Sequence, residues 1–129
     1  MLMDPEVKRD LKLTSLRYNQ FTAAVAIADI FAADVPEDKM RFILAILFNN
    51  ATYTDNGAVT VRRILEDNTT EDFIDSIPVP AGEAHLVGEI DINKPILVLA
   101  GGQNLGALRD EAPDIELTIW WIDYPDAGK

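Results

Sequence analysis

The segment from Met40 to Phe48 constrains the fold most, because its residues Met-Arg-Phe-Ile-Leu-Ala-Ile-Leu-Phe form a nearly continuous apolar run. A run of this length is typical of a strand buried on both faces or lying at a subunit contact. Asn49-Asn50 and Asp55-Asn56-Gly57 follow it and supply turn residues. The segment Val59–Ile64 is rich in β-branched residues, so it predicts the next strand.

The segment that begins at Phe21 admits two interpretations. Its alanines favour a helix, whereas Phe21, Ala23, Val25, Ile27 and Phe31 occupy alternate positions and favour a strand. We predict one strand over residues 21–33, closed by the turn at residues 35–38.

The later part of the chain predicts more short strands, at residues 73–74, 84–90, 95–100 and 115–122. Two prolines exclude a helix over 77–82, and the glycine-rich segment 101–106 predicts a loop. Seven or eight short strands without a helix predict an all-β fold, an antiparallel β-sandwich with jelly-roll or related Greek-key connections. We expect this sandwich to span residues 15–125, between an extended N-terminal arm at 1–14 and a C-terminal tail at 126–129.

Composition narrows the possible partners. The chain of 129 residues carries 11 basic and 22 acidic residues, a net charge of −11 that repels phosphate backbones and argues against direct nucleic-acid binding. It contains no cysteine, which excludes disulfides, thiolate nucleophiles and zinc–thiolate sites. The charged start carries no secretory signal, and the weakly polar stretch 21–33 is too short to span a bilayer, so we expect no membrane partner.

The residues that carry catalysis are scarce. His85 is the only histidine, and Ser15 and Ser76 are the only serines, so a nucleophile–base relay or a two-histidine metal site is not expected. We therefore predict no catalytic residue, no cofactor and no transition-metal site. Acidic residues gather in turns, as at Asp110, Glu111 and Asp114, which leaves an oxygen-only calcium site open as an alternative.

Trp120, Trp121 and Tyr124 form the one aromatic concentration. Exposed aromatic rings stack on sugars, so a carbohydrate- or ligand-binding module, for example on a phage tail or fibre, is one interpretation. The other is that one tryptophan faces the core and its neighbour a subunit interface.

A larger pattern runs from Val35-Pro36 through the strand at 39–44, Asn49-Asn50 and the strand at 58–62. It continues with Ile77-Pro78-Val79-Pro80-Ala81-Gly82-Glu83, Pro95-Ile96-Leu97-Val98 and the closing strand at 115–119. This pattern, over about two-thirds of the chain, resembles the small β-sandwich virion proteins of tailed bacteriophages, which include capsid decoration proteins and head or tail accessory proteins.

The resemblance implies a structural protein without catalysis, made in the host cytoplasm and located on the virion surface. Its implied partners are other copies of itself, as a homotrimer, and the major capsid protein or another virion protein. The residues expected at oligomer or capsid contacts are Leu2, Val7, Leu11, Leu13, Phe42, Leu44, Trp120 and Trp121.

Overall fold

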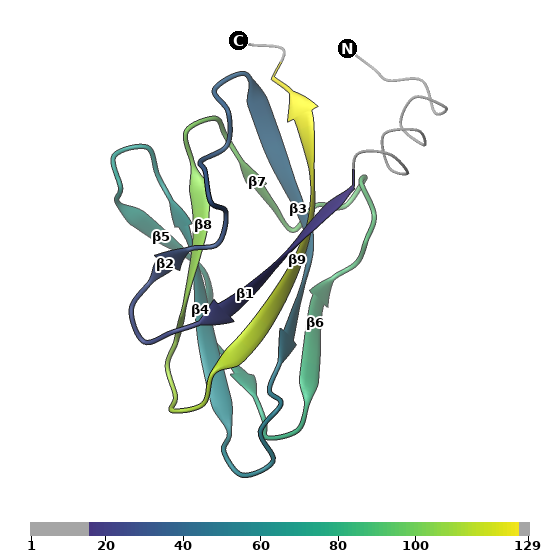
Figure 1. Ribbon diagram of the computed structural model, residues 1–129. Helices are drawn as coiled ribbons and strands as arrows, with labels where there is room; N and C mark the ends of the chain where they lie inside the picture. Colours follow the sequence, from purple (N-terminus) through teal and green to yellow (C-terminus); the bar gives the residue numbers. More distant parts are fainter. Residues whose placement is uncertain (1–15, 127–129) are drawn as a thin grey trace.

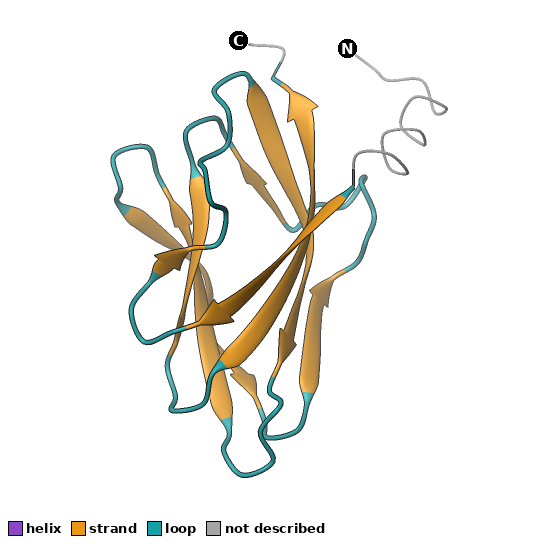
Figure 2. Ribbon diagram, in the orientation of Figure 1, coloured by secondary structure: helices purple, strands orange, loops and turns teal. Residues whose placement is uncertain are grey.

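The chain folds into two antiparallel β-sheets that face each other (Figure 1), as described by a computed structural model for residues 16–126. Nine strands lie within these residues: β1 (Arg17–Ala23), β2 (Ala28–Asp29), β3 (Lys39–Asn49), β4 (Gly57–Ile64), β5 (Thr70–Val79), β6 (Ala84–Gly88), β7 (Leu97–Leu99), β8 (Asn104–Arg109) and β9 (Ile115–Pro125). Figure 2 shows strands joined by loops throughout the described part of the chain.

The order of the strands is that of a jelly roll. The first sheet has the order β1-β9-β3-β6, with β7 also paired to β3, and the second sheet has the order β2-β8-β4-β5. Strands from the start of the chain pair with strands from its end, as in β1 with β9 and β2 with β8. This pairing of early with late strands is the jelly-roll arrangement. The predicted all-β sandwich with jelly-roll connections is therefore confirmed.

The main core fills the space between the two sheets. In β9, Ile115, Leu117 and Ile119 are fully buried and alternate with residues that face away from the core. The opposing sheet contributes Val59 and Leu105, which are equally buried. This alternation assigns an inner and an outer face to each strand.

A second, smaller cluster lies on the other side of the first sheet. Leu44, Ile92 and Ile122 are its buried members, and Leu16, Phe42 and Tyr124 pack against them. Ile122 follows Trp121, which packs against the main core, so alternation places Ile122 on the outer face.

The strand predicted at Met40–Phe48 is confirmed as β3, and the residues from Ile43 to Ile46 have no exposed surface. Its pairing with β9 shifts register between Ile43 and Ala45, which places Leu44 at a β-bulge. The run is apolar without alternation because the main core covers one face of β3 and the second cluster covers part of the other.

The prediction of a single strand over residues 21–33 is wrong. β1 ends at Ala23 in the first sheet, and the chain then crosses to the second sheet, where β2 occupies only Ala28–Asp29. Val25, in this crossing, is 69% exposed. The alternation of apolar residues continued past the end of β1, because a period-two pattern does not mark where a chain leaves its sheet.

The loop predicted at residues 101–106 is correct only at its start. Gly102 adopts a φ of 83° in the turn, but β8 begins at Asn104 and pairs with both β4 and β2. A Cβ on Gly106 would lie 2.9 Å from Ile64 Cδ1 and 3.0 Å from Ile27 Cγ1. Gly106 therefore lies in a strand rather than in a loop, and its missing side chain lets Ile64 and Ile27 pack directly over the backbone of β8.

The strand predicted at 73–74 is part of a longer one, because β5 runs from Thr70 to Val79 and includes Pro78. A proline is tolerated there because β5 is an edge strand. The other boundaries moved less: β6 ends at Gly88 rather than at 90, and β7 covers only Leu97–Leu99 of the predicted 95–100.

Candidate assembly surface

The outward side of the first sheet, which we call the outer face, is the surface best suited to contact another protein. Strand register aligns its residues in rows: Tyr18, Trp120, Ala45 and Gly88 lie side by side, from β1 through β9 and β3 to β6. The neighbouring row contains Gln20, Thr118, Leu47 and Leu86. Most of these side chains are apolar or uncharged.

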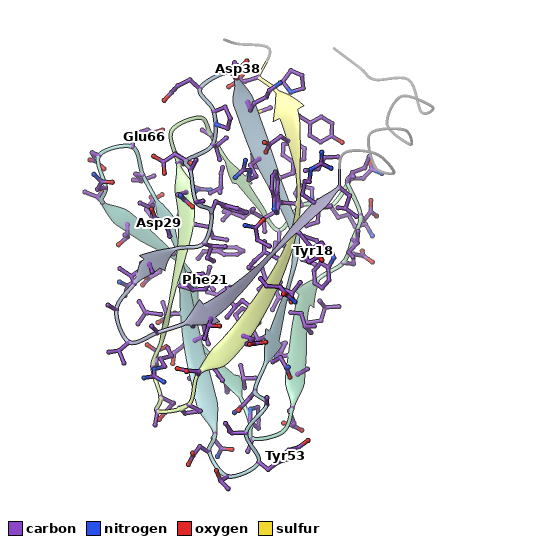
Figure 3. The ribbon with its side chains drawn as sticks, in the orientation of Figure 1. Tyr18, Phe21, Asp29, Asp38, Tyr53 and Glu66 are labelled. Carbon is purple, nitrogen blue, oxygen red and sulfur yellow. The ribbon has the colours of Figure 1, made fainter. Side chains whose placement is uncertain are left out.

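Several large apolar side chains of the outer face are open to solvent. Tyr18 is 65% exposed, Leu86 is 54% exposed, and Val98, which pairs with Phe42, is 37% exposed. Figure 3 labels Tyr18 and Phe21 on β1, which point to opposite faces of the sheet because they are three residues apart. Tyr18 lies at one edge of this face and Leu86 and Val98 lie beyond β3, with half-buried Trp120, Leu47 and Phe42 between them. Covering these apolar side chains gains free energy.

The second sheet presents a different surface. Arg62 donates from Nε to Asp72 Oδ1 at 2.8 Å, and Thr60 Oγ1 donates to Asp110 Oδ2 at 2.7 Å. These polar side chains already hydrogen-bond to neighbours on the same chain. The exposed large apolar side chains Tyr18, Leu86 and Val98 thus lie on the outer face of the first sheet, whereas Arg62 and Asp72 form an ion pair on the second.

The sequence placed four contact candidates within the described residues. The structure brings Phe42 and Trp120 to the outer face, where both are partly exposed, and Phe42 packs on Tyr124 with ring centroids 4.8 Å apart. Leu44 is fully buried in the second cluster, so it supports this surface from below. The remaining candidates, Leu2, Val7, Leu11 and Leu13, lie outside the described residues.

Trp121 occupies the inner face. Its Nε1 donates to Asn19 Oδ1 at 2.9 Å, and its ring meets that of Phe31 edge to face at 5.3 Å. The guanidinium of Arg41 lies over the same indole, 3.9 Å from the ring centroid, and is held by Asp123. These contacts make Trp121 a packing residue, in agreement with the prediction that the two tryptophans face opposite ways.

Tyr18, Leu86 and Val98 were missed by the sequence interpretation. β1 and β6 are short strands of mixed polarity, and an exposed apolar residue in such a strand has no distinctive pattern. Only the register that aligns Tyr18 with Trp120 and Leu86 with Leu47 shows that these residues share one surface.

The groups considered for chemistry do not come together. His85 lies on β6 in the first sheet and Ser76 on β5 in the second, where Ser76 has a φ of 50° and its backbone N–H donates to Thr60 Oγ1. Within residues 16–126, no three His, Asp or Glu side chains are grouped closely enough to hold a metal ion. None of these residues belongs to a helix long and apolar enough to cross a membrane.

A cavity of about 240 Å³ is lined by Arg63, Glu71, Asp72, Phe73 and Leu97. Neither tryptophan contributes to it, and Trp121 is occupied by Arg41 and Phe31. Trp121 is therefore not open to stack on a sugar ring, whereas Trp120 is half-buried on the outer face beside Tyr18.

Among residues 16–126, two titratable groups have shifted pKa values. Burial raises the pKa of Tyr124, in the second cluster, above its ordinary value of 10.0. In the turn between β4 and β5, hydrogen bonds from Thr69 lower the pKa of Asp67, whose Oδ1 accepts from the Thr69 hydroxyl at 2.6 Å and from its backbone N–H at 3.0 Å. Asp67 is an exposed turn residue, so its shift reflects local structure.

Comparison with known proteins identifies similar arrangements of the chain at low sequence identity. No family model matches, and no curated protein matches. Among solved structures, a Bacillus endospore appendage pilus protein is 18% identical, with a TM-score of 0.48 over 85% of this chain and 84% of that one. A pentameric capsid protein from metagenomic phage sequences is 14% identical, with a TM-score of 0.41 over 99% and 79%. A structure of infectious bursal disease virus, Gx strain, is 15% identical, with a TM-score of 0.44 over 87% of this chain and 32% of that one.

Proposed function

We propose that this protein is a non-enzymatic structural subunit that self-associates through the outer face of its first sheet. The observation that supports this proposal is the exposure of Tyr18, Leu86 and Val98 beside the half-buried Phe42 and Trp120. Full burial of one large apolar side chain contributes roughly 1.5–3 kcal/mol. A contact that buries several of these side chains therefore gains this free energy for each of them.

At the finer level, we propose a capsid decoration protein that forms a homotrimer and binds the major capsid protein on the virion surface. The resemblance to phage virion proteins suggests this role, and the net charge of −11 fits a subunit whose solvent-facing sides must not associate indiscriminately. Leu16, the first described residue, packs in the second cluster on the outer face.

Sedimentation equilibrium at micromolar concentration tests the self-association. The expected mass is a multiple of 14.3 kDa, three times that value for the trimer. Replacing Tyr18 and Leu86 together by serine should weaken the association at least tenfold, because both side chains lose apolar contact area. A protein that stays monomeric at high concentration would refute the proposal.

Tyr53→Ser provides a matched control. Tyr53 is 88% exposed and lies in the loop after β3, at the lower end of the molecule in Figure 3, away from Tyr18. This variant removes a comparable exposed ring and should leave the mass unchanged. An equal loss of association in the control would mean that general surface hydrophobicity, rather than the outer face, drives assembly.

Deletion of residues 1–14 tests the arm. The sandwich strands begin at Arg17, so the β-sheet circular-dichroism signal and most of the thermal stability should persist in the truncated protein. Oligomerisation or attachment to capsids that lack this protein should weaken, as seen by electron microscopy of particles mixed with each form. A truncated protein that assembles and binds particles as well as the full chain would show that the arm has no such role.

A further inference from the structure

The two sheets differ in how well their edges are protected against pairing with another strand. In the second sheet, β2 has only two residues, and β5 carries Pro78 together with the exposed acidic residues Glu71, Asp72 and Asp75. Short edge strands, prolines and charges are the features that block edge-to-edge pairing. The edges of the second sheet are therefore protected.

The edges of the first sheet lack these features. β1, with the sequence Arg-Tyr-Asn-Gln-Phe-Thr-Ala, has no proline and a single charged residue at its first position. β6, with the sequence Ala-His-Leu-Val-Gly, has neither a proline nor an acidic residue, lysine or arginine. Among residues 16–126, each pairs with a strand on one side only, β1 with β9 and β6 with β3. Their free edges can accept a further strand.

We propose that β1 of one copy pairs with β6 of the next, so that the first sheets of neighbouring subunits join into one continuous antiparallel sheet. This inference rests on the proposed self-association and places the contact between copies at the two edges of the first sheet, where Tyr18 and Leu86 of the outer face lie, while Phe42, Val98 and Trp120 stay outside this contact. Successive pairs in the sheet order are antiparallel, so β1 and β6 of one chain run in opposite directions. Two copies in the same orientation therefore present β6 and β1 to each other with antiparallel polarity. Such a head-to-tail contact closes into a ring or continues as a filament, depending on the rotation between copies.

The rows of the sheet define the register of this contact. The row that begins with Tyr18 ends with Gly88, and the row that begins with Gln20 ends with Leu86. When the rows continue into the next copy without a shift, Tyr18 lies opposite Gly88 and Gln20 opposite Leu86 of the neighbour, all on the outer face. On the inner face, Phe21 lies opposite His85. Each pair thus joins residues that point to the same side of the sheet, as pairing requires.

The side chains at this contact are complementary. The exposed ring of Tyr18 would lie opposite Gly88, which has no side chain and ends β6 with a φ of 82°. Arg17, at the start of β1, would lie at the same end of the contact as Glu89, which follows β6 directly and pairs with Lys94 in an exposed ion pair. Opposite charges at that end favour this head-to-tail pairing over β1–β1 pairing, which places no acidic residue of either strand beside Arg17.

Cysteine cross-linking tests the register cleanly, because the chain contains no cysteine of its own. Gln20→Cys and Leu86→Cys place thiols on exposed outer-face positions at the centres of β1 and β6. Under mild oxidation, an equal mixture of the two variants should give disulfide-linked dimers, and each variant alone should give at least tenfold fewer. Gln20→Cys mixed with Asp75→Cys, on the protected β5 edge, measures cross-linking by random collision.

The possible outcomes separate the two proposals. Dimers from Gln20→Cys alone would overturn this inference in favour of a twofold β1–β1 contact, and dimers from Leu86→Cys alone would favour a twofold β6–β6 contact. If the unmodified protein is oligomeric by sedimentation but the mixture cross-links no better than the Asp75→Cys control, edge pairing is refuted while self-association stands. If the unmodified protein is monomeric, both proposals fail.

Discussion

Arg41 is a buried cation that joins three parts of the fold. Its Nε and Nη2 donate to the two carboxylate oxygens of Asp123 at 2.8 and 3.0 Å, and its guanidinium lies 4.5 Å from the ring centroid of Phe31 and 3.9 Å from that of Trp121. The side chain of Arg41 is 8% exposed and that of Asp123 is 25% exposed. The substitution Arg41→Met therefore removes a charge-assisted pair and two ring contacts at once.

The expected loss follows from these contacts. Hydrogen bonds to charged groups contribute about 1.5–3 kcal/mol, and the lower part of that range applies because Asp123 retains access to water. The two cation–π contacts add roughly 0.5–1 kcal/mol each, and methionine keeps part of the packing along the side-chain stem. We expect the free energy of unfolding to fall by about 2–4 kcal/mol.

Urea unfolding followed by tryptophan fluorescence measures this loss. With a slope of about 1–3 kcal/mol per molar urea, a loss of about 2–4 kcal/mol should lower the midpoint by at least about 0.7 M. Arg62→Met is the matched control, because Arg62 makes an ion pair with Asp72 at the same 2.8 Å but the two side chains are 35% and 57% exposed. This control should cost less than about 1 kcal/mol. Equal losses in the two variants would refute the assignment of Arg41 as a buried link between β3, β9 and the segment around Phe31.

Three further predictions concern other parts of the fold. Asn104→Ala should lower the free energy of unfolding by about 2–4 kcal/mol in urea titrations. The buried Asn104 amide donates to Phe31 O and accepts from the Leu105 N–H, and the substitution removes this partner from both backbone groups. A loss below about 1 kcal/mol would contradict this prediction. Asn68→Val should cost about 1–2 kcal/mol while Asn68→Gly should be nearly neutral, because Asn68 has a φ of 68°; equal thermal midpoints for the two variants would contradict it. Because folding raises the pKa of Tyr124, the stability that the protonated Tyr124 contributes is present below pH 10 and is lost as the pH rises through the pKa of the folded state. Tyr124→Phe should therefore flatten the decline of the unfolding free energy at alkaline pH. An unchanged decline would exclude Tyr124 as the cause of that decline.

Much of the fold was predictable because the pattern of apolar residues within a short segment indicates a strand. The apolar run at Met40–Phe48 and the alternation at Ile115–Ile119 predicted β3 and the start of β9 correctly. A strand buried on two faces has a continuous apolar sequence, and a strand buried on one face has an alternating sequence. The prolines and glycine after Ile77 correctly excluded a helix. These features act through neighbouring residues, so the sequence alone carries them.

The errors arose where long-range packing decides the conformation. Residues 101–106 have a composition typical of loops, but Gly106 lies in a central strand because side chains from Ile27 and Ile64 need the space that a Cβ would fill. The same limit applied to the candidate site: the sequence named Phe42 and Trp120 but could not find Tyr18 or Leu86.

The order of residues is thus enough to predict the class of fold, to give the number of strands to within one or two, and to exclude cysteine chemistry. The packed chain is needed to show which strands are neighbours, which of two adjacent tryptophans faces the core, and which apolar side chains share the outer face. Turn and strand preferences depend on backbone torsions and adjacent residues, whereas register depends on contacts between residues far apart in the chain. Tyr18 and Trp120 are separated by most of the sequence, yet their pairing sets the surface on which the proposed assembly depends.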